Sequence, residues 1–289
     1  MAQTLAASLR DKQILVCVGA GGVGKTTTAT ALALAGAKTG KKTLVLTIDP
    51  ARRLANSLGL PHLDHEECRV PDDVLAPAAP VRGTLHAMML DQKRAFDQIV
   101  ERHARDPDVR ARIFANRLYQ QLSTRLSGSH EYAAMTTLQQ IDRAGRYDLV
   151  VVDTPPTQHA LDFLDAPAKV ISAIESPAID WFVRPLQTSG RFSMRLIGMG
   201  GAFVMRGIAR FVGAGLLAEM AQFFVETRGV LAGIREQAAD LAALLREPRV
   251  GFVIVASPEP VAISEALMFH DRLTAARLSI AGFVVNRMH

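Results

Sequence analysis

The chain has 289 residues, of which 49% are hydrophobic, and its mean hydropathy is +0.15. This size and apolar content suffice for one large α/β core that carries a helical insertion. The formal net charge is +5, but one tryptophan and three tyrosines offer little stacking surface for single-stranded nucleic acid, so we expect no nucleic-acid partner. Residues 1–9 lack the basic start and long apolar core of a signal peptide, which favours a cytoplasmic protein.

A predicted strand, a glycine-rich loop and a predicted helix follow one another near the N-terminus. The apolar run 14–18 predicts a buried strand, and the alanine-rich segment 26–38 predicts a helix. Between them, residues 19–28 read G-A-G-G-V-G-K-T-T-T, which matches the phosphate-binding pattern G-x-x-x-x-G-K-S/T. The pattern predicts that backbone N–H groups of 22–24 cradle a β-phosphate, that Lys25 neutralises phosphate oxygens and that the Thr26 hydroxyl holds Mg²⁺.

Two carboxylates are predicted at the ends of further strands. Asp49 follows the apolar run 43–48, and Asp153 follows the apolar run 147–152. Ligands of open α/β sheets collect at the carboxyl ends of the strands, so we expect both side chains to point towards the γ-phosphate and Mg²⁺. Either aspartate alone could be a turn former or a helix cap. Their joint position after a phosphate loop favours the binding site.

Longer segments carry a family resemblance. They are I-D-P-A-R-R-L-A-N-S-L-G-L at 48–60 and V-D-T-P-P-T-Q-H-A-L-D-F-L at 152–164. With the phosphate loop and its two central glycines, they resemble the ArsA-type ATPases, which include arsenite-pump ATPases and targeting factors for tail-anchored membrane proteins. Residues 85–97 resemble the family's third strand and next helix. The resemblance implies an α/β P-loop NTPase fold: a mostly parallel sheet flanked by helices, with helical insertions.

The resemblance also implies roles for single residues. Asp49 would orient and activate the attacking water within a switch I segment at 49–57, and Asp153 would reach Mg²⁺ directly or through water within a switch II segment at 153–159. ATP contacts would come from Gly19, Ala20, Gly21, Gly22, Val23, Gly24, Lys25, Thr26, Thr27, Pro258 and Asn286. Mg²⁺ contacts would come from Thr26, Asp49 and Asp153. Taken alone, Asn286 fits a residue that simply ends a strand, although its amide offers the donor and the acceptor that adenine requires.

The phosphate loop departs from the family pattern at one position. Where the deviant-Walker class has a lysine that reaches across a dimer, this chain has Ala20. Arg52 or Arg53 on switch I could supply the missing cation, or a paralogous subunit could supply a lysine. An exposed arginine pair is also typical of a solvated surface.

Cysteine content and switch II differ as well. Cys17 and Cys68 are the two cysteines, and C-x-x-C does not occur. This excludes the zinc clasp seen in some relatives, a metalloid-binding cysteine cluster and an iron–sulfur centre. Pro155 and Gln158 stand where the family commonly has alanine and glycine, so we expect a switch II that moves less or responds more slowly.

With the resemblance, the order of predicted elements implies one P-loop ATPase domain over residues 1–289, with helical insertions at 91–145 and 165–247 that form a subdomain. Residues 61–80, rich in proline and acidic residues, predict an irregular surface connection. Apolar residues at spacings of three and four over 216–245 predict a long amphipathic helix. The excess of Phe, Met and Gly in 192–224 favours a groove for an apolar helix within 192–245, with an ordinary helical core as the alternative.

These features predict an ATP-dependent switch that hydrolyses ATP slowly with Mg²⁺. The cycle would open and close a homodimer, or a heterodimer with a paralogous subunit, around a hydrophobic helix client or membrane-protein partner. Two alternatives stay open. One is the ATPase subunit of an anion or metalloid efflux pump, which the cysteine content disfavours. The other is a nucleotide-gated scaffold with little turnover, which a measured rate of hydrolysis would distinguish.

Overall fold

The structure is a computed structural model that describes residues 5–49, 53–78, 80–117, 119–120, 123, 129–154, 165–166, 168–169, 171–172, 175 and 214–288. The chain forms two compact units. The first comprises 1–95, 130–166 and 240–289, and the second comprises 96–129 and 167–239. Among the described residues, no helix is both long enough and apolar enough to cross a membrane.

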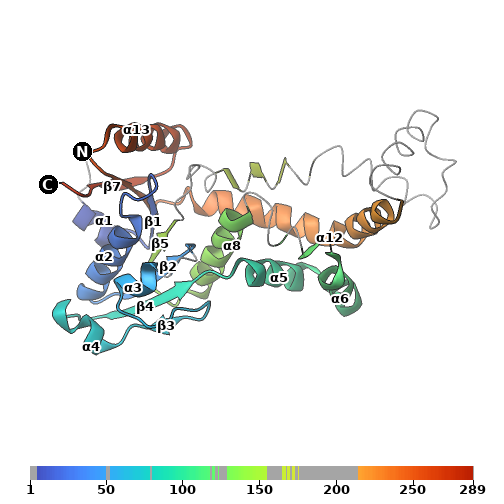
Figure 1. Ribbon diagram of the computed structural model, residues 1–289, viewed down its shortest axis with the longest axis horizontal. Coiled ribbons are helices and arrows are strands. Elements are labelled where there is room, and N and C mark those ends of the chain that lie inside the picture. The colour runs from blue at the N-terminus through green and yellow to red at the C-terminus, as the bar shows by residue number, and fades with distance from the viewer. Residues whose placement is uncertain are drawn as a thin grey trace. The chain divides into compact units, whose positions relative to one another are not determined.

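A seven-stranded sheet with the order β3-β4-β2-β5-β1-β6-β7 forms the centre of the first unit (Figure 1). All of its neighbouring strands run parallel except β3, which pairs antiparallel with β4. The strands are β1 (Ile14–Val18), β2 (Lys42–Thr47), β3 (Cys68–Arg69), β4 (Thr84–Met89), β5 (Leu149–Asp153), β6 (Val250–Ala256) and β7 (Ile280–Val285). The predicted fold class, a mostly parallel P-loop sheet, is confirmed.

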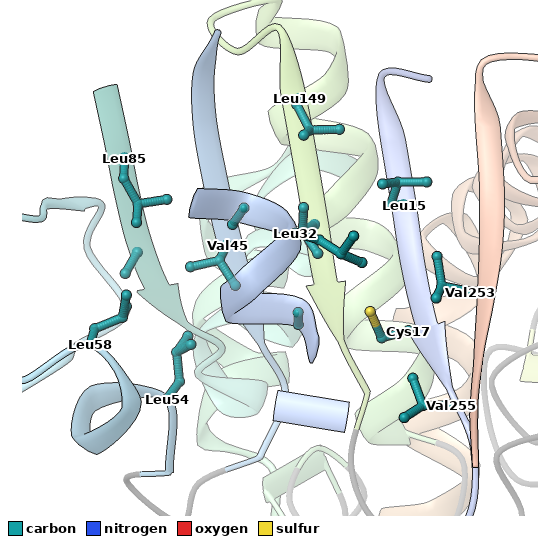
Figure 2. Packing of buried hydrophobic residues seen from close by; sticks show 14 of the residues in the cluster. Leu15, Cys17, Leu32, Val45, Leu54, Leu58, Leu85, Leu149, Val253 and Val255 are labelled. Carbon is teal, nitrogen blue, oxygen red and sulfur yellow. The ribbon is translucent and has the colours of Figure 1, made fainter. Parts of the chain in front are cut away.

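Every residue of β1, β5 and β6 is buried. These residues are apolar except Asp153 at the end of β5, and such apolar runs are typical of strands that are covered on both faces of a parallel sheet. Helix α2 (Lys25–Lys38) packs on β2 and β5. Figure 2 shows Leu32 of this helix among side chains that include Val45 and Leu149, in one cluster of buried residues. The helix approaches closely at Gly36, where an added Cβ would lie 2.5 Å from Leu149 Cδ2.

The other helices of this unit are α1 (Leu5–Asp11), α3 (Arg53–Ser57), α4 (Asp72–Leu75), the short 3₁₀ helix η1 (Ala76–Ala78), α8 (Ser129–Ala144) and α13 (Pro260–Ala275). The exposed large apolar side chains recorded for the described residues gather on α13, β7 and the residues that follow: Val261, Ile263, Leu267, Met268, Phe283, Val285 and Met288. This apolar surface lies outside the 192–245 region in which the sequence predicts a groove.

The segment 61–80 is more regular than its composition predicts. Its residues include β3, α4 and η1. Val70 is completely buried, and its backbone N–H donates to the carbonyl oxygen of Leu85 at 2.9 Å. Leu63 and Leu75 of the same segment are buried as well. Buried apolar side chains thus anchor this stretch and allow an antiparallel edge strand, which its proline and acidic content does not predict.

The second unit is helical in its described parts. It contains most of α5 (Gln92–His103), α6 (Pro107–Ala115) and most of α12 (Ala214–Leu244). Helix α6 begins at Pro107, where Asp106 caps the helix by accepting a hydrogen bond from the Asp108 N–H. The buried cluster of this unit comprises Val100, Ala104, Ile113, Tyr119, Phe223 and Val230.

The described part of the 192–245 region contains buried apolar residues, as the core interpretation expects. Phe223 and Val230 are buried in the second unit, and Leu241 is buried near the end of α12. Residues 192–213 lie outside the described residues. Helix α8, predicted as part of the first insertion, groups with the sheet unit. The proposed extent of the insertions, 91–145 and 165–247, therefore remains an interpretation of the sequence.

Candidate nucleotide-binding site

The backbone of the loop between β1 and α2 requires glycine at several positions. Gly22 and Gly24 have φ angles of 78° and 96°, in the left-handed region that other residues rarely adopt. An added Cβ at Gly19 would lie 2.0 Å from the carbonyl oxygen of Val255 on β6. Helix α2 starts at Lys25, directly after Gly24. Among the other predicted contacts, Gly21 and Thr27 are exposed and Ala20 and Val23 are buried.

The Lys25 side chain is buried over this loop. Its Nζ donates to the carbonyl oxygens of Gly19 at 3.0 Å and Ala20 at 2.7 Å. Burial lowers the pKa of Lys25, and the negative charge of Asp153 acts in the opposite direction. The ammonium group therefore contacts the first two residues of the loop whose 22–24 backbone the sequence predicts to cradle a phosphate.

Asp153 ends β5 and is fully buried. Its Oδ2 accepts from the Thr26 hydroxyl at 2.8 Å and from the Thr47 hydroxyl at 3.0 Å. Burial raises the pKa of Asp153 to about 6, although both hydrogen bonds and the Lys25 charge lower it. Its Oδ1 is buried without a hydrogen-bond partner among the described residues. A buried carboxylate oxygen beside a threonine hydroxyl at the start of the loop helix fits a hard divalent cation, since such an oxygen is costly to leave unsatisfied.

Asp49 lies two residues beyond β2, and its residue is 7% exposed. Its backbone N–H donates to the Thr47 hydroxyl at 3.2 Å, so this one hydroxyl contacts both aspartates. The Arg53 Nη1, at the start of α3, lies 3.4 Å from Asp49 Oδ2. The structure therefore brings together Lys25, Thr26, Asp49 and Asp153. Residues 50–52 of switch I and 155–159 of switch II lie outside the described residues.

Asn286, the predicted adenine contact, is held against the phosphate loop. Its Nδ2 donates to the carbonyl oxygen of Val23 at 3.0 Å, and its backbone N–H donates to Ala256 at 2.8 Å. An added Cβ at Gly24 would lie 2.2 Å from the same Nδ2. Pro258 is exposed in the turn before α13. The adenine role of both residues stays a prediction, but Asn286 also connects the end of β7 to the loop.

The sequence analysis did not predict two threonines that contact the site. Thr47 contacts both aspartates, and Thr154 donates to the Cys17 carbonyl oxygen at 2.7 Å, which joins the end of β5 to β1. The sequence could have indicated both, because each threonine stands at the end of an apolar strand within two residues of a site aspartate. Burial also raises the pKa of the Cys17 thiol, so this thiol stays neutral within the strand.

A parallel sheet with a phosphate loop between its first strand and the following helix defines a P-loop nucleoside-triphosphate-binding protein. The family model described as anion-transporting ATPase, ArsA_ATPase, matches residues 12–289. The chain therefore belongs to the ArsA-type ATPase family, and its predicted class of activity, ATP hydrolysis, is confirmed.

Relatives with curated names agree with this family. The chain is 27% identical over 271 residues to the ATPase get3 of Aspergillus terreus and 28% identical over 162 residues to the ATPase GET3 of Malassezia globosa. It is 30% identical over 168 residues to a Halobacterium salinarum protein provisionally named as an arsenical pump-driving ATPase. These alignments cover 93%, 55% and 55% of this chain, respectively. They cover 71%, 44% and 24% of the relatives, so two of the three extend well beyond the matched region.

Proposed function

We propose that this chain is a Mg²⁺-dependent ATP switch in which Asp49 orients the attacking water and Lys25, Thr26 and Asp153 hold the phosphates and the metal. The observation that carries the proposal is the pairing of Thr26 with Asp153. It joins the loop helix to a buried carboxylate whose second oxygen has no hydrogen-bond partner among the described residues. When bound, Mg²⁺ would neutralise charge on the β- and γ-phosphate oxygens.

Each of these residues would have its own role in ATP hydrolysis. Glycine N–H groups and Lys25 position the phosphates, and Asp49 accepts a hydrogen bond from the water. The water oxygen forms a bond to the γ-phosphorus while the bond to the β–γ bridging oxygen breaks, and that electron pair leaves with ADP. The water proton passes to Asp49 and then to phosphate. Two contacts support this role for Asp49: its backbone N–H donates to the Thr47 hydroxyl, and the same hydroxyl donates to Asp153.

We further propose that nucleotide drives dimer closure, with a homodimer or a paralogous subunit as the partner. Ala20 contributes a carbonyl oxygen to Lys25 and carries no charge, so it cannot stabilise phosphates across a dimer. The chain alone should therefore hydrolyse ATP slowly, because cations that contact the transferring phosphoryl group are worth roughly 10³–10⁵ in rate. If closure places Ala20 near the partner's phosphates, Ala20→Lys should accelerate turnover.

The proposed cargo is a hydrophobic helix client or a membrane-protein partner, which rests on the family resemblance. An efflux-pump subunit is the second candidate, favoured by the family's description and by the name of the Halobacterium relative. Cys17 is buried inside β1 and Cys68 is exposed on β3, so neither offers the close thiolate pair that would capture a soft metalloid. This candidate therefore needs a ligand set other than cysteine.

Light scattering during size-exclusion chromatography tests the switch. The protein would be measured without nucleotide, with Mg²⁺-ADP and with Mg²⁺ and a non-hydrolysable ATP analogue. We expect a shift to twice the mass with the analogue, and a smaller shift or none with ADP. Lys25→Ala serves as the variant that should fail to respond. An unchanged mass at saturating analogue would contradict a homodimeric switch, and copurification of a paralogous subunit in the ATP-locked state would support the heterodimer.

A further inference from the structure

Charged side chains of both signs lie around the phosphate loop. In the part of the chain that the structure describes, the site holds the carboxylates of Asp49 and Asp153, the ammonium group of Lys25 on the loop, and the guanidinium group of Arg53 beside Asp49. The loop residue Ala20 adds no charge. Arg53 is thus the second cation of this site.

Arg53 is placed by its backbone. It is the first residue of α3, which begins four residues after Asp49. Its Nη1 lies 3.4 Å from Asp49 Oδ2, yet 56% of its side chain is exposed, against 8% for Asp49. The guanidinium group therefore reaches from solvent to the carboxylate that we propose orients the attacking water.

In the ion pair between Arg53 and Asp49, another anion can replace Asp49 as the partner of Arg53. Charge-assisted N–H···O contacts are typically about 2.7–2.9 Å long, so a 3.4 Å contact is loose. The guanidinium group is the half-exposed member of the pair, so water can take over its hydrogen bonds when it leaves Asp49. A terminal phosphate carries more negative charge than one carboxylate and presents paired oxygens, which match the planar guanidinium fork. A γ-phosphate near Asp49 would therefore compete well for Arg53.

We propose that Arg53 is a γ-phosphate sensor and a catalytic cation supplied by the same chain. Without a γ-phosphate it pairs with Asp49, and with one it moves to the γ-phosphate oxygens. The move adds positive charge where negative charge develops and leaves Asp49 to bind water. This inference rests on the proposed function, because it presumes ATP in the loop and Asp49 beside the attacked phosphorus.

The experiment compares Arg53→Ala, Arg53→Lys and Arg69→Ala with the parental protein. Arg69 is the matched control, because it is also about half exposed, at 58%, and forms a local ion pair, with Asp72 at 3.1 Å. For each protein we would measure kcat and KM for Mg²⁺-ATP, the affinities for ADP and for a non-hydrolysable ATP analogue, and the melting temperature.

We expect Arg53→Ala to lower kcat by about 10²–10³-fold, at or below the range known for catalytic arginines. It should also reduce the preference for the ATP analogue over ADP by about tenfold, while ADP affinity and the melting temperature stay near parental values. Arg53→Lys keeps the charge but loses the fork, so it should recover part of kcat. Arg69→Ala should behave as the parent.

Parental kcat and parental ATP preference in Arg53→Ala would overturn the proposal. So would an equal loss in Arg69→Ala, or an equal loss of ATP and ADP affinity, since either would point to a general electrostatic or structural effect. If Arg53→Ala lowers the melting temperature, the test rests on Arg53→Lys. An Arg53→Lys protein that melts like the parent but recovers no kcat would contradict the proposed role of Arg53 as a γ-phosphate sensor. The proposed function is separate: it fails if the parental protein does not hydrolyse ATP, or if Asp49→Asn is as active as the parent.

Discussion

The Thr26 hydroxyl donates to Asp153 Oδ2 across 2.8 Å, which connects the first turn of α2 to the end of β5. This contact pre-positions a hydroxyl and a carboxylate before any metal is present. We expect Thr26→Val to remove the Mg²⁺-dependent part of ATP affinity, by about tenfold or more, equivalent to ~1.4 kcal/mol. Titration calorimetry with Mg²⁺ and with EDTA measures that part directly.

Thr30→Val is the control for this change. Thr30 lies one turn further along α2, and its hydroxyl donates to the Thr26 carbonyl oxygen at 2.8 Å within the helix. Its replacement should leave the Mg²⁺ dependence intact. A Thr26→Val protein whose ATP affinity still rises with Mg²⁺ as in the parent would remove Thr26 from the metal site.

Gly24 and Asn286 form a second close contact. At Gly24 an added Cβ would lie 2.2 Å from Asn286 Nδ2, and φ is 96°; at Gly40, φ is 99° and an added Cβ meets nothing within 4 Å. Both alanine variants pay for the left-handed backbone, about 1–2 kcal/mol. We expect Gly24→Ala to cost more in urea unfolding and to lose ATP affinity, because Asn286 must also move.

A double variant sharpens this test. Asn286→Ala in the Gly24→Ala background removes the clashing amide, so it should restore part of the unfolding free energy. Equal losses for Gly24→Ala and Gly40→Ala, with no recovery in the double variant, would show that the contact does not constrain the loop.

Two glycines of α12 differ in their surroundings. Gly229 is exposed, and a Cβ there would meet nothing within 4 Å, whereas a Cβ at Gly233 would lie 2.0 Å from His103 Nδ1. Gly229→Ala should raise the unfolding free energy by about 0.5–1 kcal/mol through helix propensity. Gly233→Ala should lower it by about 1–3 kcal/mol through overpacking. Thermal unfolding of both variants checks the packing of the second unit, and the same sign for both would contradict it.

His86 on β4 gives the fold a pH dependence. Burial, followed by the charge of Lys42, lowers the pKa of His86 below its ordinary value. The unfolded chain therefore binds a proton near pH 6.5 while the folded chain resists it, so stability falls as pH drops from 7 to 5. His86→Leu should flatten this part of the urea-unfolding profile. An unchanged slope in His86→Leu would contradict the burial argument.

Local patterns predicted the fold and the positions of four candidate site residues in it. The strand at 14–18 has the bounds expected from its apolar run, and the sequence places Lys25, Thr26, Asp49 and Asp153 at the carboxyl edge where the structure has them. Such predictions succeed because they depend on short-range pattern and on the topology of parallel sheets.

Side-chain partners that depend on tertiary distance were not predictable. Asn286 lies 263 residues from the Val23 carbonyl that it contacts, and Thr47 lies 106 residues from Asp153. The edge strand β3 was not predicted because a few buried apolar residues, Leu63, Val70 and Leu75, outweigh the proline and acidic content of their segment. The role of Arg53 also needed the structure, since only the distance to Asp49 separates it from an ordinary solvated arginine.

The most direct test of the account is the rate of ATP hydrolysis in Asp49→Asn, measured together with ATP affinity and with Lys25→Ala as the reference. Asp49→Asn removes the carboxylate that we propose orients the water but keeps the shape of the side chain, so the variant should bind Mg²⁺-ATP like the parent and lose turnover by orders of magnitude. Lys25→Ala should lose both, because its ammonium belongs to the phosphate loop. Hydrolysis at the parental rate by Asp49→Asn would contradict the central claim that Asp49 activates the attacking water.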